Sequence, residues 1–139
     1  MSPPTLVIFV GLPAAGKSTH YFAHFAATHV HVSKDLLLRG ARQEPLIDAA
    51  LAAGKSVVVD NTNPSAAIRA PLIALGRRHG ARIVAYFFEA DVKTLLARNR
   101  QREGKARVPD VALFVTRKKL APPSYDEGFD EIHVIETTD

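Results

Sequence analysis

The residues Gly11-Leu12-Pro13-Ala14-Ala15-Gly16-Lys17-Ser18 follow the pattern G-x-x-x-x-G-K-[ST] at every fixed position. In this pattern the glycines let the backbone curl so that successive N–H groups hold phosphates, and the lysine reaches the terminal phosphates. The Ser18 hydroxyl is then placed for Mg²⁺. An apolar run precedes the motif, and a helical pattern from Gly16 to about Ala27 begins in its last residues. We therefore expect Gly11–Thr19 to bind ATP, or another nucleoside triphosphate, together with Mg²⁺.

Two carboxylates stand where predicted strands end. Asp35 follows the short strand Val30–Val32, where it could take or orient the proton of an acceptor hydroxyl. An N-cap of the next helix fits Asp35 equally well. Asp60 ends the strand Val57–Val59, a position from which an acidic residue can hold Mg²⁺ through water and face a substrate. Asn63, directly before Pro64, is expected to be the N-cap of the following helix.

Basic side chains concentrate in one part of the chain. The net charge is +4, yet residues 91–119 carry nine basic and three acidic side chains, and residues 120–139 carry six acidic and no basic ones. Arg98 and Arg102 are four residues apart, so they share a helix face. Arginines on a segment that covers a nucleotide can neutralise a transferring phosphoryl group. We expect a short arginine-rich lid, and the alternative is a solvated basic helix face.

The elements that must position these residues alternate regularly along the chain. Apolar runs at 5–10, 30–32, 57–59, 82–88 and 131–135 are separated by helical patterns, the longest at 64–79, with Gly80 and Asp91 at helix ends. Such alternation predicts a mostly parallel, five-stranded α/β sheet with helices on both faces. Ligands bind beyond the carboxyl ends of the strands in such sheets. Residues 1–139 are expected to form a single domain.

Composition excludes several classes of protein. Cysteine is absent, so disulfides, thiolate metal sites and a cysteine nucleophile are excluded. No apolar run approaches the roughly 18 residues that a membrane span requires, and the first residues lack the charged region of a signal peptide. We expect a cytoplasmic protein without a membrane partner.

Taken in order, the phosphate loop, V-S-K-D at 32–35, V-V-V-D-N-T-N-P at 57–64, the arginine-rich segment 98–109 and P-P-S-Y-D-E-G-F at 122–129 resemble the 5′-hydroxyl polynucleotide kinases. The resemblance is to the kinase module of polynucleotide kinase-phosphatases. It implies an adenylate-kinase-like P-loop kinase fold, a three-layer sandwich, with Asp35 as general base for the 5′-OH. Lys17 would act on the donor phosphates together with Arg98 and Arg102.

Two departures from the family pattern concern the acceptor. Lys34 stands where many members have arginine, and Leu38 stands where some have an arginine that grips an acceptor phosphate. Arg39, one residue further on, is the candidate left for that contact. The resulting expectation is transfer of the γ-phosphate of ATP to a 5′-OH end of DNA or RNA. Transfer to a small-molecule hydroxyl, and a nucleotide-dependent switch without transfer, remain the alternatives.

Overall fold

One parallel sheet organises the chain. The structure, a computed structural model, describes residues 3–34, 37, 42–102 and 107–136. Its strands are β1 (Thr5–Gly11), β2 (His29–Val32), β3 (Ser56–Asp60), β4 (Arg82–Glu89) and β5 (Glu131–Glu136). They form a five-stranded sheet in the order β2-β3-β1-β4-β5, and all four pairings are parallel. The predicted α/β sheet is therefore confirmed.

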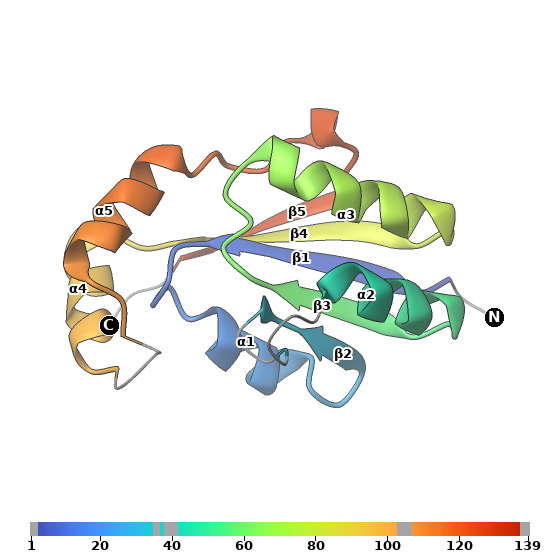
Figure 1. Cartoon of the computed structure of the whole chain (residues 1–139), viewed down its shortest axis with the longest axis horizontal. Helices are drawn as coiled ribbons and strands as arrows, with labels where there is room; N and C mark the ends of the chain where they lie inside the picture. Colours follow the sequence, from blue (N-terminus) through green and yellow to red (C-terminus); the bar gives the residue numbers. More distant parts are fainter. Residues whose placement is uncertain (1–2, 35–36, 38–41, 103–106, 137–139) are drawn as a thin grey trace.

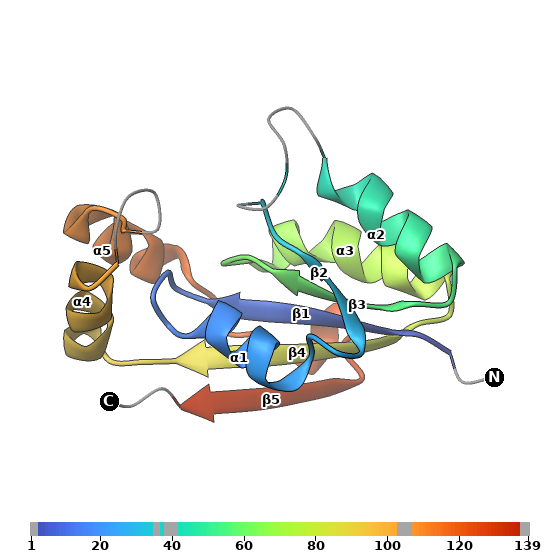
Figure 2. The ribbon, with the colours of Figure 1, turned by 90° about the horizontal axis from the view of Figure 1, so that it is seen from below.

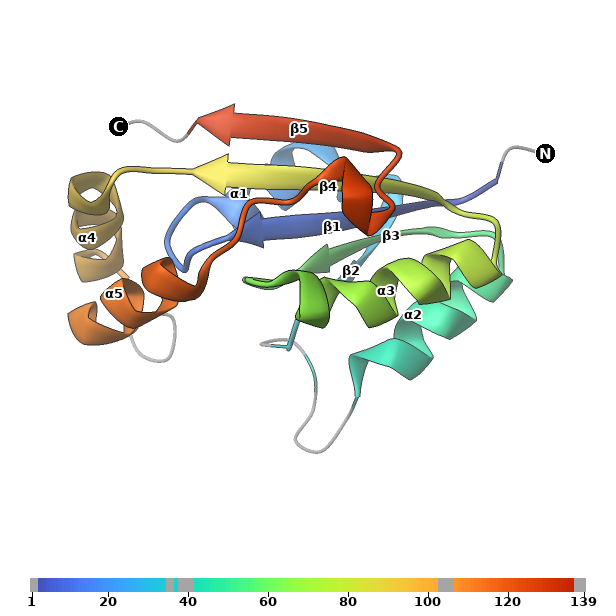
Figure 3. The same cartoon turned by 90° about the horizontal axis from the view of Figure 1, so that it is seen from above.

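Helices cover both faces of this sheet and extend beyond one end of it. Helix α1 (Lys17–His24) lies on one face, and α2 (Gln43–Ala52) and α3 (Ala66–Arg78) lie on the other (Figures 1 and 2). Helices α4 (Val92–Arg100) and α5 (Asp110–Lys119) lie side by side past the carboxyl end of β4 (Figure 3). This three-layer arrangement leaves the carboxyl ends of β1 and β3 facing α4 and α5.

The central strand β1 is buried on both faces, which explains its unbroken apolar sequence. Leu6, Ile8 and Val10 pack among the residues beneath α2 and α3. Val7 and Phe9 pack on the α1 side. Because neighbouring side chains of a strand point to opposite faces, a strand with a helix layer on each side needs apolar residues throughout.

A glycine sets how closely α3 approaches the sheet. A Cβ atom added to Gly76 would lie 2.4 Å from a side-chain carbon of Ile83 and 2.8 Å from one of Leu6. Real Cβ atoms essentially never come so close, so a larger residue at this position would force the ends of the Ile83 and Leu6 side chains to shift. On the opposite face, α1 ends at His24, earlier than the predicted end near Ala27. The chain turns there, because the N–H groups of Thr28 and His29 both donate to the Phe25 carbonyl.

Within the described residues, no helix is long and apolar enough to cross a membrane. Asp35 and Arg39, the predicted general base and the candidate acceptor contact, lie outside the described residues.

Candidate nucleotide and acceptor site

The phosphate-binding loop lies between β1 and α1 and has the backbone that its glycines allow. Gly16 adopts φ 93° at the N-cap of α1, and Ala14 adopts φ 69°. Both values lie in the left-handed region, where an L-residue such as Ala14 is disfavoured. The Lys17 ammonium donates to the carbonyl oxygens of Gly11 (2.5 Å) and Leu12 (3.2 Å). The loop is therefore curled around the end of its own lysine, with the N-terminus of α1 directly behind it.

Ser18 and Asp60 meet beside this loop, as the sequence predicts. The Ser18 hydroxyl donates to Asp60 Oδ2 at 2.8 Å. Asp60 is only 5% exposed, and the end of β1 lies next to it because Phe9 pairs with Asp60 across the two strands. A hydroxyl and a carboxylate are oxygen ligands of the kind that Mg²⁺ prefers, with water and phosphate oxygens completing its coordination. The two residues therefore fit a magnesium ion.

A histidine that the sequence analysis did not single out completes this group. His31 Nε2 lies 2.8 Å from the same Asp60 oxygen. Its ring is stacked on Tyr21 with centroids 3.8 Å apart. Burial raises the pKa of Tyr21, whose hydroxyl donates to the His29 carbonyl. Among the described residues, no three His, Asp or Glu side chains form a group that could hold a metal ion. The contact of His31 is with Asp60.

The segment after Asp60 fixes the wall of the site opposite the loop. The Gly11 N–H donates to the Thr62 carbonyl at 3.1 Å. Asn61 accepts from the Lys34 N–H and donates to Gln43, each at 2.8 Å. These contacts join the ends of β1, β2 and β3 to the start of α2, so the polar side chains following β3 are held by several elements at once.

Asn63 is not the helix cap that its position before Pro64 predicts. Ser65 caps α3 and accepts from the Ile68 N–H at 3.2 Å. Asn63 is buried, adopts φ 45°, and donates its side-chain amide to the Phe9 carbonyl at 2.7 Å. The prediction was wrong because the amide has a better partner in β1 than in the first turn of the helix.

Arg69 is fully buried and connects this wall to the C-terminal part of the chain. Its guanidinium bonds both carboxylate oxygens of Glu127, at 2.7 and 3.0 Å, and donates to the Asn63 carbonyl at 2.8 Å. It also donates to the carbonyls of Ala121 and Pro122. Burial pushes the pKa of Glu127 up, but the Arg69 hydrogen bonds, a hydrogen bond from the Ser124 backbone and the Arg69 charge together hold it below the ordinary value.

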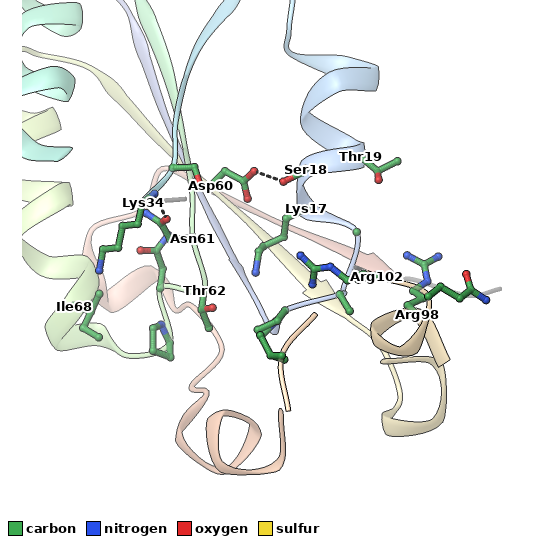
Figure 4. A pocket seen from close by; sticks show the side chains of 18 residues that line it. Lys17, Ser18, Thr19, Lys34, Asp60, Asn61, Thr62, Ile68, Arg98 and Arg102 are labelled. Carbon is green, nitrogen blue, oxygen red and sulfur yellow. Dashed lines mark hydrogen bonds between the residues drawn. The ribbon is translucent and has the colours of Figure 1, made fainter. Parts of the chain in front are cut away.

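The lid arginines face the phosphate loop across a cavity of about 770 Å³. Figure 4 shows Lys34, Asn61, Thr62 and Ile68 on one side, Arg98 and Arg102 on the other, and Lys17 and Ser18 between them. Arg102 Nη1 is buried and has no hydrogen-bond partner among the described residues. A buried, unsatisfied guanidinium nitrogen is costly, and its position beside the phosphate loop fits an anionic ligand.

The structure thus brings most of the predicted site residues together. The cavity is lined by Pro13, Ala14, Gly16, Lys17, Ser18, Thr19, Asp60, Arg98 and Arg102, among others. Gly11, Leu12 and Ala15 form the buried base of the loop. Three residues make contacts that no sequence motif predicted: His31, Arg69 and Asn99. The one signal in the sequence was the unusual placement of Arg69 and Asn99 at positions of helical segments that face the core.

Comparisons with known proteins agree with this geometry. A family model described as an AAA domain matches residues 40–123, more than half of the chain. The chain belongs to this AAA-domain family. The predicted similarity to polynucleotide kinases is confirmed by two curated relatives. A protein of Acanthamoeba polyphaga mimivirus named as a bifunctional polynucleotide phosphatase/kinase is 28% identical over 94% of this chain. The bifunctional polynucleotide phosphatase/kinase of Schizosaccharomyces pombe is 25% identical over 94%.

Solved structures show the same P-loop kinase fold. Kti12 of Chaetomium thermophilum, in complex with ADP-AlF3, superposes with a TM-score of 0.72 at 14% identity over 96% of this chain and 90% of that one. A sugar kinase from Janibacter sp. gives 0.69 at 18% identity over 97% and 86%. A chain of the Pnkp1/Rnl/Hen1 RNA repair complex gives 0.66 at 26% identity over 87% and 47%. This chain spans 32 to 33% of the length of the two curated relatives.

Proposed function

We propose that the chain is an ATP-dependent kinase that transfers the γ-phosphoryl group to a 5′-hydroxyl end of DNA or RNA. The observation that carries the proposal is the cavity described above. It has a phosphate loop in its middle, two arginines on one side, and on the other a polar wall that includes a lysine. The similarity to polynucleotide phosphatase/kinases supports a nucleic acid as the acceptor.

In the proposed reaction, the 5′ oxygen attacks the γ-phosphorus. A new O–P bond forms, the bond from the γ-phosphorus to the β–γ bridging oxygen breaks, and ADP leaves. Asp35, the residue after Lys34 of the cavity wall, is proposed to take the proton of the hydroxyl. Lys17, Arg98 and Arg102 would hold the phosphate oxygens and exclude water from them.

Ser18 and Asp60 are the residues proposed to hold Mg²⁺. Mg²⁺ held there would supply positive charge that offsets the charge of the phosphates. The Ser18–Asp60 hydrogen bond keeps the two oxygens together, so the ligands are preorganised next to the phosphate loop. Arg39 remains a proposed contact for a phosphate of the acceptor strand.

Incubation with γ-labelled ATP, Mg²⁺ and a 5′-OH oligonucleotide tests the proposal. We expect the label on DNA or RNA oligonucleotides with a free 5′-OH and none on the same oligonucleotides with a 5′-phosphate. Asp35→Asn should reduce transfer by about 10²-fold or more, the usual contribution of a general base, while binding of ATP is retained. Absence of labelling on both nucleic acids, or full activity of Asp35→Asn, would overturn it.

A second candidate is phosphoryl transfer to a small-molecule hydroxyl, and the likeness to a sugar kinase over nearly the whole chain favours it. The two functions are separated by competition. Short unlabelled 5′-OH oligonucleotides should suppress transfer by a polynucleotide kinase and leave a small-molecule kinase unaffected. Hydrolysis of ATP that no hydroxyl acceptor changes would instead indicate a nucleotide-dependent switch.

A further inference from the structure

Asn99 is a fully buried polar residue in the last turn of α4. Its side-chain amide pairs with the backbone of Val108 in both directions. Nδ2 donates to the Val108 carbonyl at 2.5 Å, and Oδ1 accepts from the Val108 N–H at 2.9 Å. A weaker contact of 3.5 Å runs from Nδ2 to Asp110 Oδ1. The side chain thus imitates a peptide group and ties the end of α4 to the start of α5.

The Asn99–Val108 pair lies on either side of Arg102 in the sequence, and Arg102 lines the nucleotide site. Arg102 follows Asn99 by one helical turn, and its backbone N–H donates to the Asn99 carbonyl at 3.1 Å. Val108, the residue that Asn99 holds, lines the cavity together with Arg102. The Asn99 backbone therefore holds the Arg102 N–H, and the Asn99 side chain holds Val108. Between them lies Arg102, whose Nη1 is buried without a partner among the residues described.

Helix stability alone does not explain the choice of asparagine at this position. Asparagine is a poor helix former, and burial of its amide costs free energy unless all of its polar atoms are bonded. An apolar side chain could pack under α4, as Leu95 does at 2% exposure. What asparagine adds is the two-way bond to a chosen peptide group nine residues later.

We propose that Asn99 is a positioning residue that holds Arg102 over the terminal phosphates of a bound nucleoside triphosphate. The proposal rests on the nucleotide site of the proposed function but not on the nature of the acceptor. It makes a specific claim about energetics: the contribution of Asn99 to binding passes through Arg102. A residue that merely stabilises the fold would contribute whether or not Arg102 is present.

A double-mutant cycle in nucleotide binding tests this claim. Dissociation constants for the non-hydrolysable ATP analogue AMPPNP with Mg²⁺ are measured by calorimetry for the wild type, Asn99→Ala, Arg102→Ala and the double variant. Charged hydrogen bonds contribute about 1.5–3 kcal/mol, so we expect each single change to weaken binding about tenfold or more. The double variant should bind no more weakly than Arg102→Ala, because residues that act through one another are not additive.

Two controls separate positioning from damage to the fold. Affinity for AMP, which lacks the terminal phosphates, should be the same in the wild type and Asn99→Ala. Asp91→Ala removes the N-cap of the same helix, where the Asp91 side chain accepts from the Thr94 N–H, without touching the Val108 contact, and it should leave AMPPNP affinity unchanged at temperatures where the variant is folded. Additive effects in the cycle, or equal weakening of AMP and AMPPNP, would overturn the role of Asn99.

The same measurements distinguish this inference from the proposed function. If the wild type binds AMPPNP but labels no oligonucleotide, the acceptor assignment fails while the role of Asn99 is still decided by the cycle. If the wild type does not bind AMPPNP, both proposals fall.

Discussion

Glu127→Gln is the substitution for which the structure gives the most defined expectation. Glu127 is the counter-ion of the fully buried Arg69, and its own side chain is 12% exposed. Its two oxygens accept from Arg69 Nε, Arg69 Nη2 and the Ser124 N–H. Glutamine has nearly the same shape, so the change removes the charge and half of the accepting capacity while creating almost no cavity.

The expected loss follows from these contacts. Removal of one partner of a buried ion pair costs about 3–5 kcal/mol, because the other charge stays buried without compensation. The amide oxygen of glutamine can still accept from Arg69 Nε or, in the Oε2 position, from both Arg69 Nη2 and the Ser124 N–H. We therefore expect a loss of about 3 kcal/mol, at the lower end of that range. In a domain of this size that corresponds to a fall in Tm of about 10 °C.

Glu131→Gln is the matched control. Glu131 forms an ion pair with Arg82, but both side chains are well exposed, at 42% and 50%. Exposed pairs contribute about 0–1 kcal/mol, so this variant should unfold close to the wild type. The chain has no tryptophan, so urea unfolding is best followed by far-UV circular dichroism.

The pH dependence gives an independent check. The pKa of Glu127 is lowered in the folded state, so its stabilising effect is present above the pKa of the unfolded chain, about 4.3. That effect declines as the pH falls through the lowered value. The difference between wild type and Glu127→Gln should therefore be constant from pH 7 to 5 and narrow below about pH 4.3. A Glu127→Gln loss below about 1 kcal/mol, or equal to that of Glu131→Gln, would refute the reasoning about the buried pair.

The other two predictions concern residues that contact the site. His31→Ala removes the ring that bonds Asp60. It should raise the Mg²⁺ concentration for half-maximal activity about tenfold, as for other residues that orient metal ligands. His31→Gln keeps a donor and should restore most of the Mg²⁺ affinity, whereas equal Mg²⁺ dependence in the wild type and both variants would contradict this role of His31. Asn63→Ala leaves the Phe9 carbonyl without its donor and should cost about 1–3 kcal/mol in urea unfolding. Asn63→Gly relieves the φ of 45° and should lose less, so an equal loss in both would assign the whole effect to the hydrogen bond.

The sequence predicted the sheet closely because each strand is a local pattern. All five predicted runs lie in observed strands, and the bounds differ by one residue or less at each end. Strands buried on both faces must be apolar throughout, and this requirement is visible in a few consecutive residues. The phosphate loop is likewise local, since its backbone depends on glycines at fixed spacing.

The contacts missed by the sequence analysis are long-range. The partner of Arg69 lies 58 residues away, and that of His31 lies 29 residues away. The core-facing helix position of Arg69 hints that its side chain is buried, but the partner that neutralises it cannot be identified from the sequence. Asn63 is another case in which a long-range contact decides. Its local sequence predicts a helix cap, but its side-chain amide instead bonds the Phe9 carbonyl, 54 residues earlier.

The hydrogen bonds of the site divide it into two parts with different supports. The phosphate loop and the wall after Asp60 are joined directly, because the Gly11 N–H donates to the Thr62 carbonyl. The spacing between the loop and this wall is therefore set by the sheet. Arg98 and Arg102 come from a separate segment, the arginine-rich segment 98–109. Asn99 anchors this segment by bonding Val108. Beyond α5, Arg69 anchors the chain by donating to the carbonyls of Ala121 and Pro122. Arg69 also donates to the Asn63 carbonyl. Its side chain therefore contacts both the wall after Asp60 and the chain that follows the arginine-rich segment. Because Glu127 bonds Arg69 through both carboxylate oxygens, we expect the E-G-F segment at 127–129 to influence the site indirectly, by fixing where the chain after α5 returns to the sheet.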